Sequence, residues 1–178
     1  MKLEEKTLNK NYIYKGKIIN LRVDDALLPN GNSAKREVVE HPGGVCVAAL
    51  TKENELLLVK QFRYPYGQEI LEIPAGKREA GEDPLCCGIR ELAEETGAKS
   101  DNFEFLGQIY PTPGYTDEII YLYLAKDVTF GNANPDDDEF VEVIKMPFEQ
   151  ALQKVLSNEI KDSKTQIAVL MINAKKQA

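Results

Sequence analysis

Short stretches of apolar residues along the chain predict β-strands. The stretch at 45–50 is apolar without interruption, which is typical of a strand buried on both faces of a sheet. The other predicted strands are 12–19, 21–28, 34–40, 56–62, 70–73, 103–110, 118–126 and 140–145. Pro29-Asn30-Gly31 separates two of these strands and predicts a hairpin turn.

Longer stretches at 84–96, 147–157 and 163–174 have the apolar spacing of helices. Before the first of them, Asp83 is a suitable N-cap, and Gly97 after it is a stop signal. The apolar stripe of this helix, which we expect to face the core, consists of Leu85, Ile89, Leu92 and Thr96. Because strands and helices interleave, the sequence predicts an α/β fold with a mixed sheet covered by helices on both faces.

The His-Pro-Gly-Gly sequence at 41–44 interrupts the strand pattern. We therefore expect residues 1–42 to form a small antiparallel β unit and residues 43–178 to form the main domain. His41, the single histidine, suits either a structural hydrogen bond in this turn or a role as a base.

The composition is that of a folded globular protein, with 178 residues, 43% of them hydrophobic and 29% charged. A net charge of −7 argues against binding to nucleic acid or to an anionic membrane. No stretch approaches the ~20 apolar residues that cross a bilayer. The cysteine count is odd and Cys86 and Cys87 are adjacent, so we expect no disulfide framework and a cytoplasmic location.

Glutamates crowd the end of the helix at 84–96. Glu91 and Glu95 lie one turn apart, where like charges cost an isolated helix about 0.2–0.5 kcal/mol per pair. A hard divalent cation such as Mg²⁺ takes oxygen ligands and would compensate for this repulsion. The alternative is a solvated acidic face on which Arg90 and Glu94 form a pair.

A longer pattern favours the metal site. Gly76, Glu82 and residues 90–98 fit the form G-x5-E-x7-R-E-U-x-E-E-x-G-U, where U is aliphatic and Ala98 is the weakest match. This resembles the signature of the Nudix hydrolases, and the resemblance covers roughly residues 43–175. It implies the Nudix α/β/α sandwich, hydrolysis of a diphosphate linked to another group, and Mg²⁺ or Mn²⁺ as cofactor.

The resemblance also assigns roles to residues. The implied metal ligands are the backbone carbonyl of Ala75 and the carboxylates of Glu91, Glu94 and Glu95. Glu94 and Glu95 are also the implied catalytic residues of the helix. Arg90 and Glu82 would orient the ligands, since carboxylates on a metal need further hydrogen bonds to keep their geometry.

Residues 111–118, PTPGYTDE, resemble a loop of the ADP-ribose pyrophosphatase branch of this family. The other stretches that resemble this branch are 36–43, 61–65 and 72–76. The branch implies hydrolysis of ADP-ribose to AMP and ribose 5-phosphate, with Pro113 and Glu118 in the substrate loop. It also implies that Arg36 and Arg63 contact the diphosphate or ribose, although either arginine suits a structural ion pair as well.

The resemblance leaves the catalytic base open. A base is expected in the acidic segment 131–139, GNANPDDDE, where Asp138 and Glu139 are the candidates, and Glu118 is their rival. The bland alternative is that this segment is a solvated turn.

Members of the branch commonly form homodimers through an N-terminal β unit, and residues 1–42 are compatible with this. Two other functions stay open. One is a broader pyrophosphatase for nucleoside diphosphate-sugars or dinucleotides, and the other is a non-catalytic regulator that binds ADP-ribose.

Overall fold

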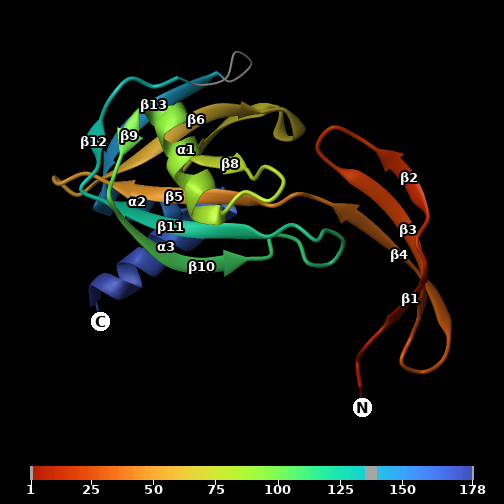
Figure 1. Ribbon diagram of the computed structural model, residues 1–178. Helices are drawn as coiled ribbons and strands as arrows, with labels where there is room; N and C mark the ends of the chain where they lie inside the picture. Colours follow the sequence, from red (N-terminus) through yellow and green to blue (C-terminus); the bar gives the residue numbers. More distant parts are fainter. Residues whose placement is uncertain (1, 135–139, 178) are drawn as a thin grey trace. The chain divides into compact units, whose positions relative to one another are not determined.

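The computed structural model describes residues 2–134 and 140–177 and divides the chain into two compact units (Figure 1). Unit 1 combines Met1–Gly43 with Tyr110–Ile119, and unit 2 combines Gly44–Ile109 with Ile120–Ala178. The loop at Tyr110–Ile119 belongs to the segment expected to form the main domain, and the structure groups it with the N-terminal strands.

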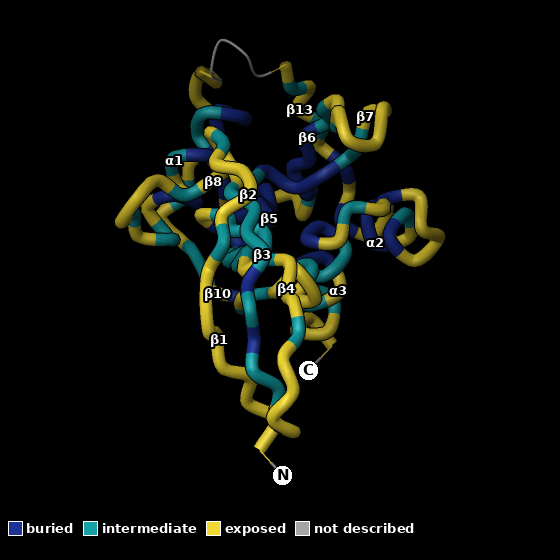
Figure 2. The backbone as a smooth tube through the Cα atoms, turned by 90° about the vertical axis from the view of Figure 1, so that its right-hand side faces the viewer, coloured by how far each residue is buried: buried dark blue, intermediate teal, exposed yellow. Residues whose placement is uncertain are grey.

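Unit 1 is built on an antiparallel sheet in which the strands pair in the order β1-β3-β2, with β4 also on β3. The strands are Lys6–Asn9 (β1), Tyr12–Lys15 (β2), Asn20–Leu27 (β3) and Ser33–Glu40 (β4). The predicted strand at 12–19 was wrong beyond Lys15, because the chain turns there and the Gly16 N–H donates to the Ile19 carbonyl at 2.9 Å. Every residue of β1 and of β2 is exposed (Figure 2).

The turn between β3 and β4 confirms the predicted hairpin. Gly31 has a φ of 86°, a left-handed conformation that glycine adopts without strain. Its N–H donates to the Leu28 carbonyl at 2.9 Å. The two strands then pair over their whole length, from Leu27 opposite Ser33 to Asn20 opposite Glu40.

The loop at Tyr110–Ile119 joins unit 1 through the end of β4. The Val39 N–H donates to the Tyr115 carbonyl at 2.7 Å, and the Asp117 N–H donates to the Val39 carbonyl at 3.2 Å. Val39 and Thr116 form a parallel bridge. These backbone bonds explain why a segment far along the chain belongs to the N-terminal unit.

Unit 2 contains a mixed sheet in the order β10-β11-β5-β6-β13, with β7 also on β6 and β8 on β5. The β11–β5 pair is parallel and the other pairs are antiparallel. The strands are Gly44–Leu50 (β5), Glu55–Arg63 (β6), Gln68–Glu72 (β7), Ala75–Lys77 (β8), Asn102–Ile109 (β10), Ile120–Lys126 (β11) and Val141–Pro147 (β13). The short strands Ala98–Lys99 (β9) and Thr129–Phe130 (β12) pair with each other, and Tyr64–Tyr66 (η1) forms a turn of 3₁₀ helix.

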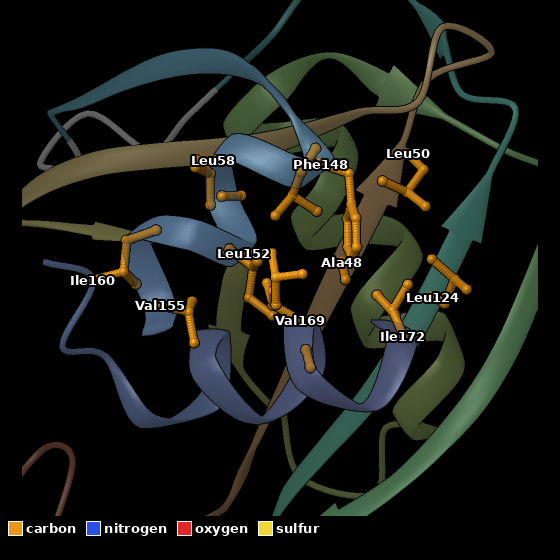
Figure 3. Close-up of a cluster of buried hydrophobic side chains, with 14 of the residues drawn as sticks. Ala48, Leu50, Leu58, Leu124, Phe148, Leu152, Val155, Ile160, Val169 and Ile172 are labelled. Carbon is orange, nitrogen blue, oxygen red and sulfur yellow. The ribbon is translucent and has the colours of Figure 1, made fainter. Parts of the chain in front are cut away.

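Helices cover both faces of the unit 2 sheet. They are Pro84–Thr96 (α1), Phe148–Leu156 (α2) and Ser163–Gln177 (α3). Strand β5 is buried throughout, as predicted, and its alternate residues point to opposite faces. The residues that pack with α2 and α3 are Cys46, Ala48 and Leu50, and Figure 3 shows Ala48 and Leu50 in this cluster. Val47 and Ala49 belong to the cluster on the α1 side. The predicted α/β fold class, with its mixed sheet and its N-terminal antiparallel sheet, is confirmed.

Strand β5 changes partner along its length. Ala49 and Leu50 pair with β6, whereas the beginning of the strand pairs with β8. Between these regions the Val47 N–H donates to the Pro74 carbonyl at 2.9 Å. The change of partner brings β8 into the sheet beside β5, where it also contacts α1.

No helix in the described part of the chain is both long and apolar enough to cross a membrane. The cysteines are free, with Cys46 and Cys87 buried and Cys86 exposed.

Candidate active site

Helix α1 begins and ends where the sequence predicts. The Asp83 carboxylate accepts hydrogen bonds from the N–H groups of Leu85 at 2.9 Å and Cys86 at 3.1 Å. These bonds satisfy backbone donors that have no partner within the helix. At the other end Gly97 has a φ of 68°, and its N–H donates to the Ala93 carbonyl at 2.9 Å.

The buried face of α1 differs from the predicted apolar stripe. Leu92 and Thr96 are buried as expected, but Leu85 is only partly buried and Ile89 is 44% exposed. The apolar pattern alone therefore misplaced the helix by part of a turn.

Gly88 explains the orientation of the helix. A Cβ atom added to Gly88 would lie 3.0 Å from Val45 and 3.1 Å from Val47, so α1 approaches β5 closely at this residue. Gly88 therefore has a packing role between α1 and β5. With Gly88 against the sheet, Glu91 and Glu95 turn inward and are only 8% and 3% exposed.

Strand β8 meets these two carboxylates through its backbone. A Cβ on Gly76 would lie 1.8 Å from Cδ of Glu91, so only glycine leaves room for this carboxylate. The Ala75 N–H donates to Oε2 of Glu95 at 3.0 Å. The structure thus brings together Ala75, Glu91 and Glu95, three of the residues predicted to hold a metal.

Arg90 connects the remaining glutamates of the signature. Its Nε lies 3.0 Å from Oε1 of Glu82, and its Nη1 lies 2.9 Å from both Glu91 and Glu94. The hydrogen bond from Arg90, aided by the Glu79 N–H, lowers the pKa of Glu82 to about 2. The same bond raises the pKa of Arg90 further above its ordinary value. Arg90 and Glu82 are therefore charged groups beside the candidate ligands, and their role in orienting those ligands stays a prediction.

The donor atoms suit a hard divalent cation. Carboxylate and backbone carbonyl oxygens are the ligands of Mg²⁺ and Mn²⁺, and they are poor ligands for soft metals. Among residues 2–134 and 140–177, no three His, Cys, Asp or Glu side chains already form a group able to hold a metal.

Arg63 forms the ion pair that was the alternative to substrate contact. Its Nε lies 2.5 Å from Oε1 of Glu72 and its Nη2 lies 2.7 Å from Oε2. Burial favours a raised pKa for Glu72, which is 1% exposed, but hydrogen bonds from Arg63 and the charge of Lys164 outweigh burial and lower it. The Arg63 side chain is 39% exposed, and its contact with substrate stays a prediction.

Arg36 and Pro113 line one pocket of unit 1, with a volume of about 260 Å³. Arg36 makes a bidentate pair with Glu5, with distances of 2.8 Å from Nε and 2.7 Å from Nη2. Asp24 and residues 113–117 also line this pocket. Arg36 and the Pro113 loop, both of which were predicted to bind substrate, therefore line the same pocket of unit 1.

Of the three candidate bases, the structure describes Glu118. Asp138 and Glu139 lie outside the described residues. Glu118 lies in unit 1, with Oε1 3.4 Å from Nδ1 of His41. Because this Nδ1 accepts a hydrogen bond from the Gly43 N–H at 3.1 Å, His41 has the structural bond that was one of its two predicted roles.

Sequence reasoning missed a buried pair of charges, Glu72 and Lys164. Glu72 lies within the predicted strand 70–73, and Lys164 resembles any lysine in the first turn of a helix. Their only sequence signal is that Glu72 belongs to the stretch at 72–76. The partner of Glu72 lies 92 residues further along the chain, beyond the reach of local patterns.

The comparisons with known proteins agree with the geometry. The NUDIX domain model matches residues 23–167, and the model of the nucleoside diphosphate sugar hydrolase N-terminal domain matches residues 5–39. A structure described as an ADP compounds hydrolase has a TM-score of 0.86 at 18% identity, covering 100% of this chain and 98% of its own. At that identity the match supports the fold alone.

Three relatives span most of the chain. The methanol dehydrogenase activator of Bacillus methanolicus is 48% identical, over 93% of this chain and 91% of its own. The ADP-ribose pyrophosphatase of Bacillus subtilis is 45% identical, over 97% of this chain and 95% of its own. The GDP-mannose pyrophosphatase of Cronobacter sakazakii is 31% identical, over 92% of this chain and 89% of its own.

Proposed function

The chain belongs to the Nudix family, and on that premise we propose that it is a divalent-cation-dependent pyrophosphatase that converts ADP-ribose into AMP and ribose 5-phosphate. The family match and the relatives support a Nudix hydrolase of the ADP-ribose pyrophosphatase branch that acts on a diphosphate. We propose in addition that the substrate is ADP-ribose and that a divalent cation is required.

The observation that carries the proposal is the pair of inward-facing carboxylates on α1. Glu91 and Glu95 are nearly buried, and both lie against the backbone of β8. Two nearly buried carboxylates one turn apart on a helix repel each other, and the 2.9 Å contact between Arg90 and Glu91 offsets part of that repulsion. A divalent cation bound by both carboxylates would offset the repulsion further, because carboxylate oxygens are the ligands that a hard cation prefers.

The residues of the site would have three roles: binding the cation, orienting its ligands and binding the substrate. Glu91, Glu95 and the Ala75 carbonyl would hold the cation, with Glu94 as a further candidate. Arg90 and Glu82 would keep the carboxylates in place. A bound cation of this kind neutralises a diphosphate and lowers the pKa of an attacking water. Arg36 and Arg63 would meet the substrate, since guanidinium groups present paired donors to phosphate oxygens.

A broader substrate range is the main alternative. It is favoured by the match of residues 5–39 to a nucleoside diphosphate sugar hydrolase domain and by the GDP-mannose pyrophosphatase relatives. The relative named as a dehydrogenase activator favours a regulatory role, either in addition to hydrolysis or instead of it.

A substrate panel separates these functions. We would measure kcat/KM for ADP-ribose, GDP-mannose, a UDP-sugar and a dinucleotide, with Mg²⁺, with Mn²⁺ and with EDTA. We expect ADP-ribose to be hydrolysed with the highest kcat/KM and EDTA to abolish turnover. Equal constants for the sugar nucleotides would establish the broader function. Tight binding of ADP-ribose without hydrolysis under any cation would establish the regulator.

We also propose a homodimer formed through unit 1. The apolar side chains on β1 and β2 support it: Leu8 is 57% exposed, Ile13 63% and Tyr14 57%. Light scattering on the full chain tests this, and a monomer at micromolar concentration would reject it. A cytoplasmic location remains a prediction.

A further inference from the structure

A buried ion pair joins the end of β7 to the beginning of α3. Glu72 is 1% exposed and Lys164 is 8% exposed, and the Lys164 ammonium contacts Oε2 of Glu72. Lys164 also lies 2.8 Å from Oδ1 of Asp162, just before α3. Glu72 has a second partner in Arg63, so its two oxygens face two cations.

Next to this pair, α3 also holds the backbone that follows β7. The Ile73 N–H donates to Oγ1 of Thr165 at 2.9 Å, and the Thr165 hydroxyl donates to Oδ2 of Asp162 at 2.5 Å. The Pro74 carbonyl accepts from the Val47 N–H of β5 at 2.9 Å. Two successive residues after Glu72 are thus fixed by hydrogen bonds.

The next residue is Ala75, whose N–H donates to Oε2 of Glu95 at 3.0 Å. The backbone from 72 to 75 therefore connects a buried ion pair on one side of the sheet to a candidate metal ligand on the other.

We propose that Glu72 and Lys164 are positioning residues for the cation site: they fix the backbone at 73–75, and this backbone sets the position of the Ala75 carbonyl and of the Glu95 carboxylate. The inference rests on the proposed function. Well-packed apolar residues often stabilise a buried site as well as an ion pair does, so stability alone does not explain Glu72 and Lys164. Hydrogen bonds between charged groups are directional, whereas apolar contacts are not. Directional bonds can fix the orientation of the backbone that carries the Ala75 carbonyl.

Two substitutions in α3 test the proposal. Lys164→Met removes the buried charge, and Lys175→Met is the matched control, since it removes the same charge from an exposed pair with Glu104. Mn²⁺ binding to the full chain would be measured by calorimetry, and kcat against Mn²⁺ concentration with ADP-ribose as substrate.

We expect Lys164→Met to weaken Mn²⁺ binding by about 10-fold, within the range known for residues that orient metal ligands, and excess Mn²⁺ to restore most of kcat. Lys175→Met should bind Mn²⁺ within about twofold of the unchanged protein, the scatter of surface substitutions away from a site. Equal Mn²⁺ affinity in a folded Lys164→Met protein would overturn the inference. If the unchanged protein binds no Mn²⁺, the proposed function fails instead.

A milder pair of variants covers the case in which Lys164→Met does not fold. Thr165→Val keeps both charges and removes only the hydroxyl that holds the Ile73 N–H, whereas Thr165→Ser keeps that hydroxyl. The proposal expects weaker Mn²⁺ binding in Thr165→Val and recovery in Thr165→Ser. Unchanged Mn²⁺ binding in Thr165→Val would overturn it.

Discussion

Arg90 on α1 and Arg36 on β4 both pair with glutamates, yet the two pairs are built differently. Arg90 contacts Glu82, Glu91 and Glu94, and its side chain is 33% exposed. Arg36 forms its ion pair with Glu5 and also donates to the Lys35 carbonyl at 3.0 Å, and its side chain is 46% exposed. A network with several partners keeps its geometry, whereas an exposed pair is worth little and opens readily.

This difference suggests different tasks. Arg90 lies among the candidate ligand carboxylates, so we expect it to orient them and expect its loss to disturb several of them together. An arginine in an exposed pair within a pocket can exchange one carboxylate for a phosphate at small cost. The site on unit 2 is therefore expected to respond to substitution through the chemical step, and the pocket on unit 1 through binding.

The largest effect is expected at Glu95. Glu95→Gln removes one anionic ligand and leaves a side chain of the same size, so we expect kcat/KM to fall by more than about 100-fold, the upper end for residues that only orient ligands. Circular dichroism should show an unchanged fold. Glu149→Gln, on the exposed face of α2, is the control. Near-normal hydrolysis by Glu95→Gln would reject the metal assignment.

Gly76→Ala is expected to come next. The new methyl group would lie 1.8 Å from Cδ of Glu91, so the carboxylate or the strand must move. We expect kcat/KM to fall by about 10- to 100-fold and Mn²⁺ to bind more weakly. Gly131→Ala is a control in the same unit, because its added carbon meets nothing closer than 3.6 Å. Equal activity in both variants would show that Glu91 does not need its observed position.

The ends of α1 could be predicted from the sequence, whereas the orientation of the helix could not. The ends of α1 depend on Asp83 and Gly97, which act within a few residues, and the Nudix signature has fixed spacing along the chain. The orientation of α1 depends on how Gly88 meets β5, which is decided by packing between distant segments. A helical stripe centred on Ile89 could not reveal it.

The same distinction applies to the fold. A continuous apolar run identified β5 because burial on both faces leaves a signal at every residue. β8 escaped prediction because it is short and pairs only with the beginning of β5. The place of the Pro113 loop in unit 1 rests on backbone bonds to Val39, and backbone bonds carry no side-chain signature.

A smaller effect is expected in unit 1. Arg36→Gln removes the charge from the pocket, and we expect KM for ADP-ribose to rise by about 10-fold with little change in kcat, since a charged hydrogen bond contributes about 1.5–3 kcal/mol. Lys35→Gln is the control, because Lys35 is a neighbouring exposed cation paired with Asp25. A loss confined to kcat would place Arg36 with the chemical step and remove the contrast with Arg90.

The smallest effect concerns the acid stability of the Arg90 network. Glu82 has a pKa of about 2 in the folded chain against an ordinary value of 4.5, so its stabilising contribution is complete above pH 4.5 and is lost as the pH falls toward 2. We expect Glu82→Gln to lower Tm by about 2–4 °C at pH 6, the shift for one partly buried pair in a domain of this size, and by nothing near pH 2. Thermal melts of the metal-free protein from pH 2 to 6 give this difference directly. Glu5→Gln in unit 1 should show a weaker trend in the same direction, because the Arg36 hydrogen bond lowers the pKa of Glu5 while both side chains remain largely in water. A Tm difference for Glu82→Gln that stays constant over this range would mean that Arg90 holds the carboxyl group no more firmly than an exposed pair does.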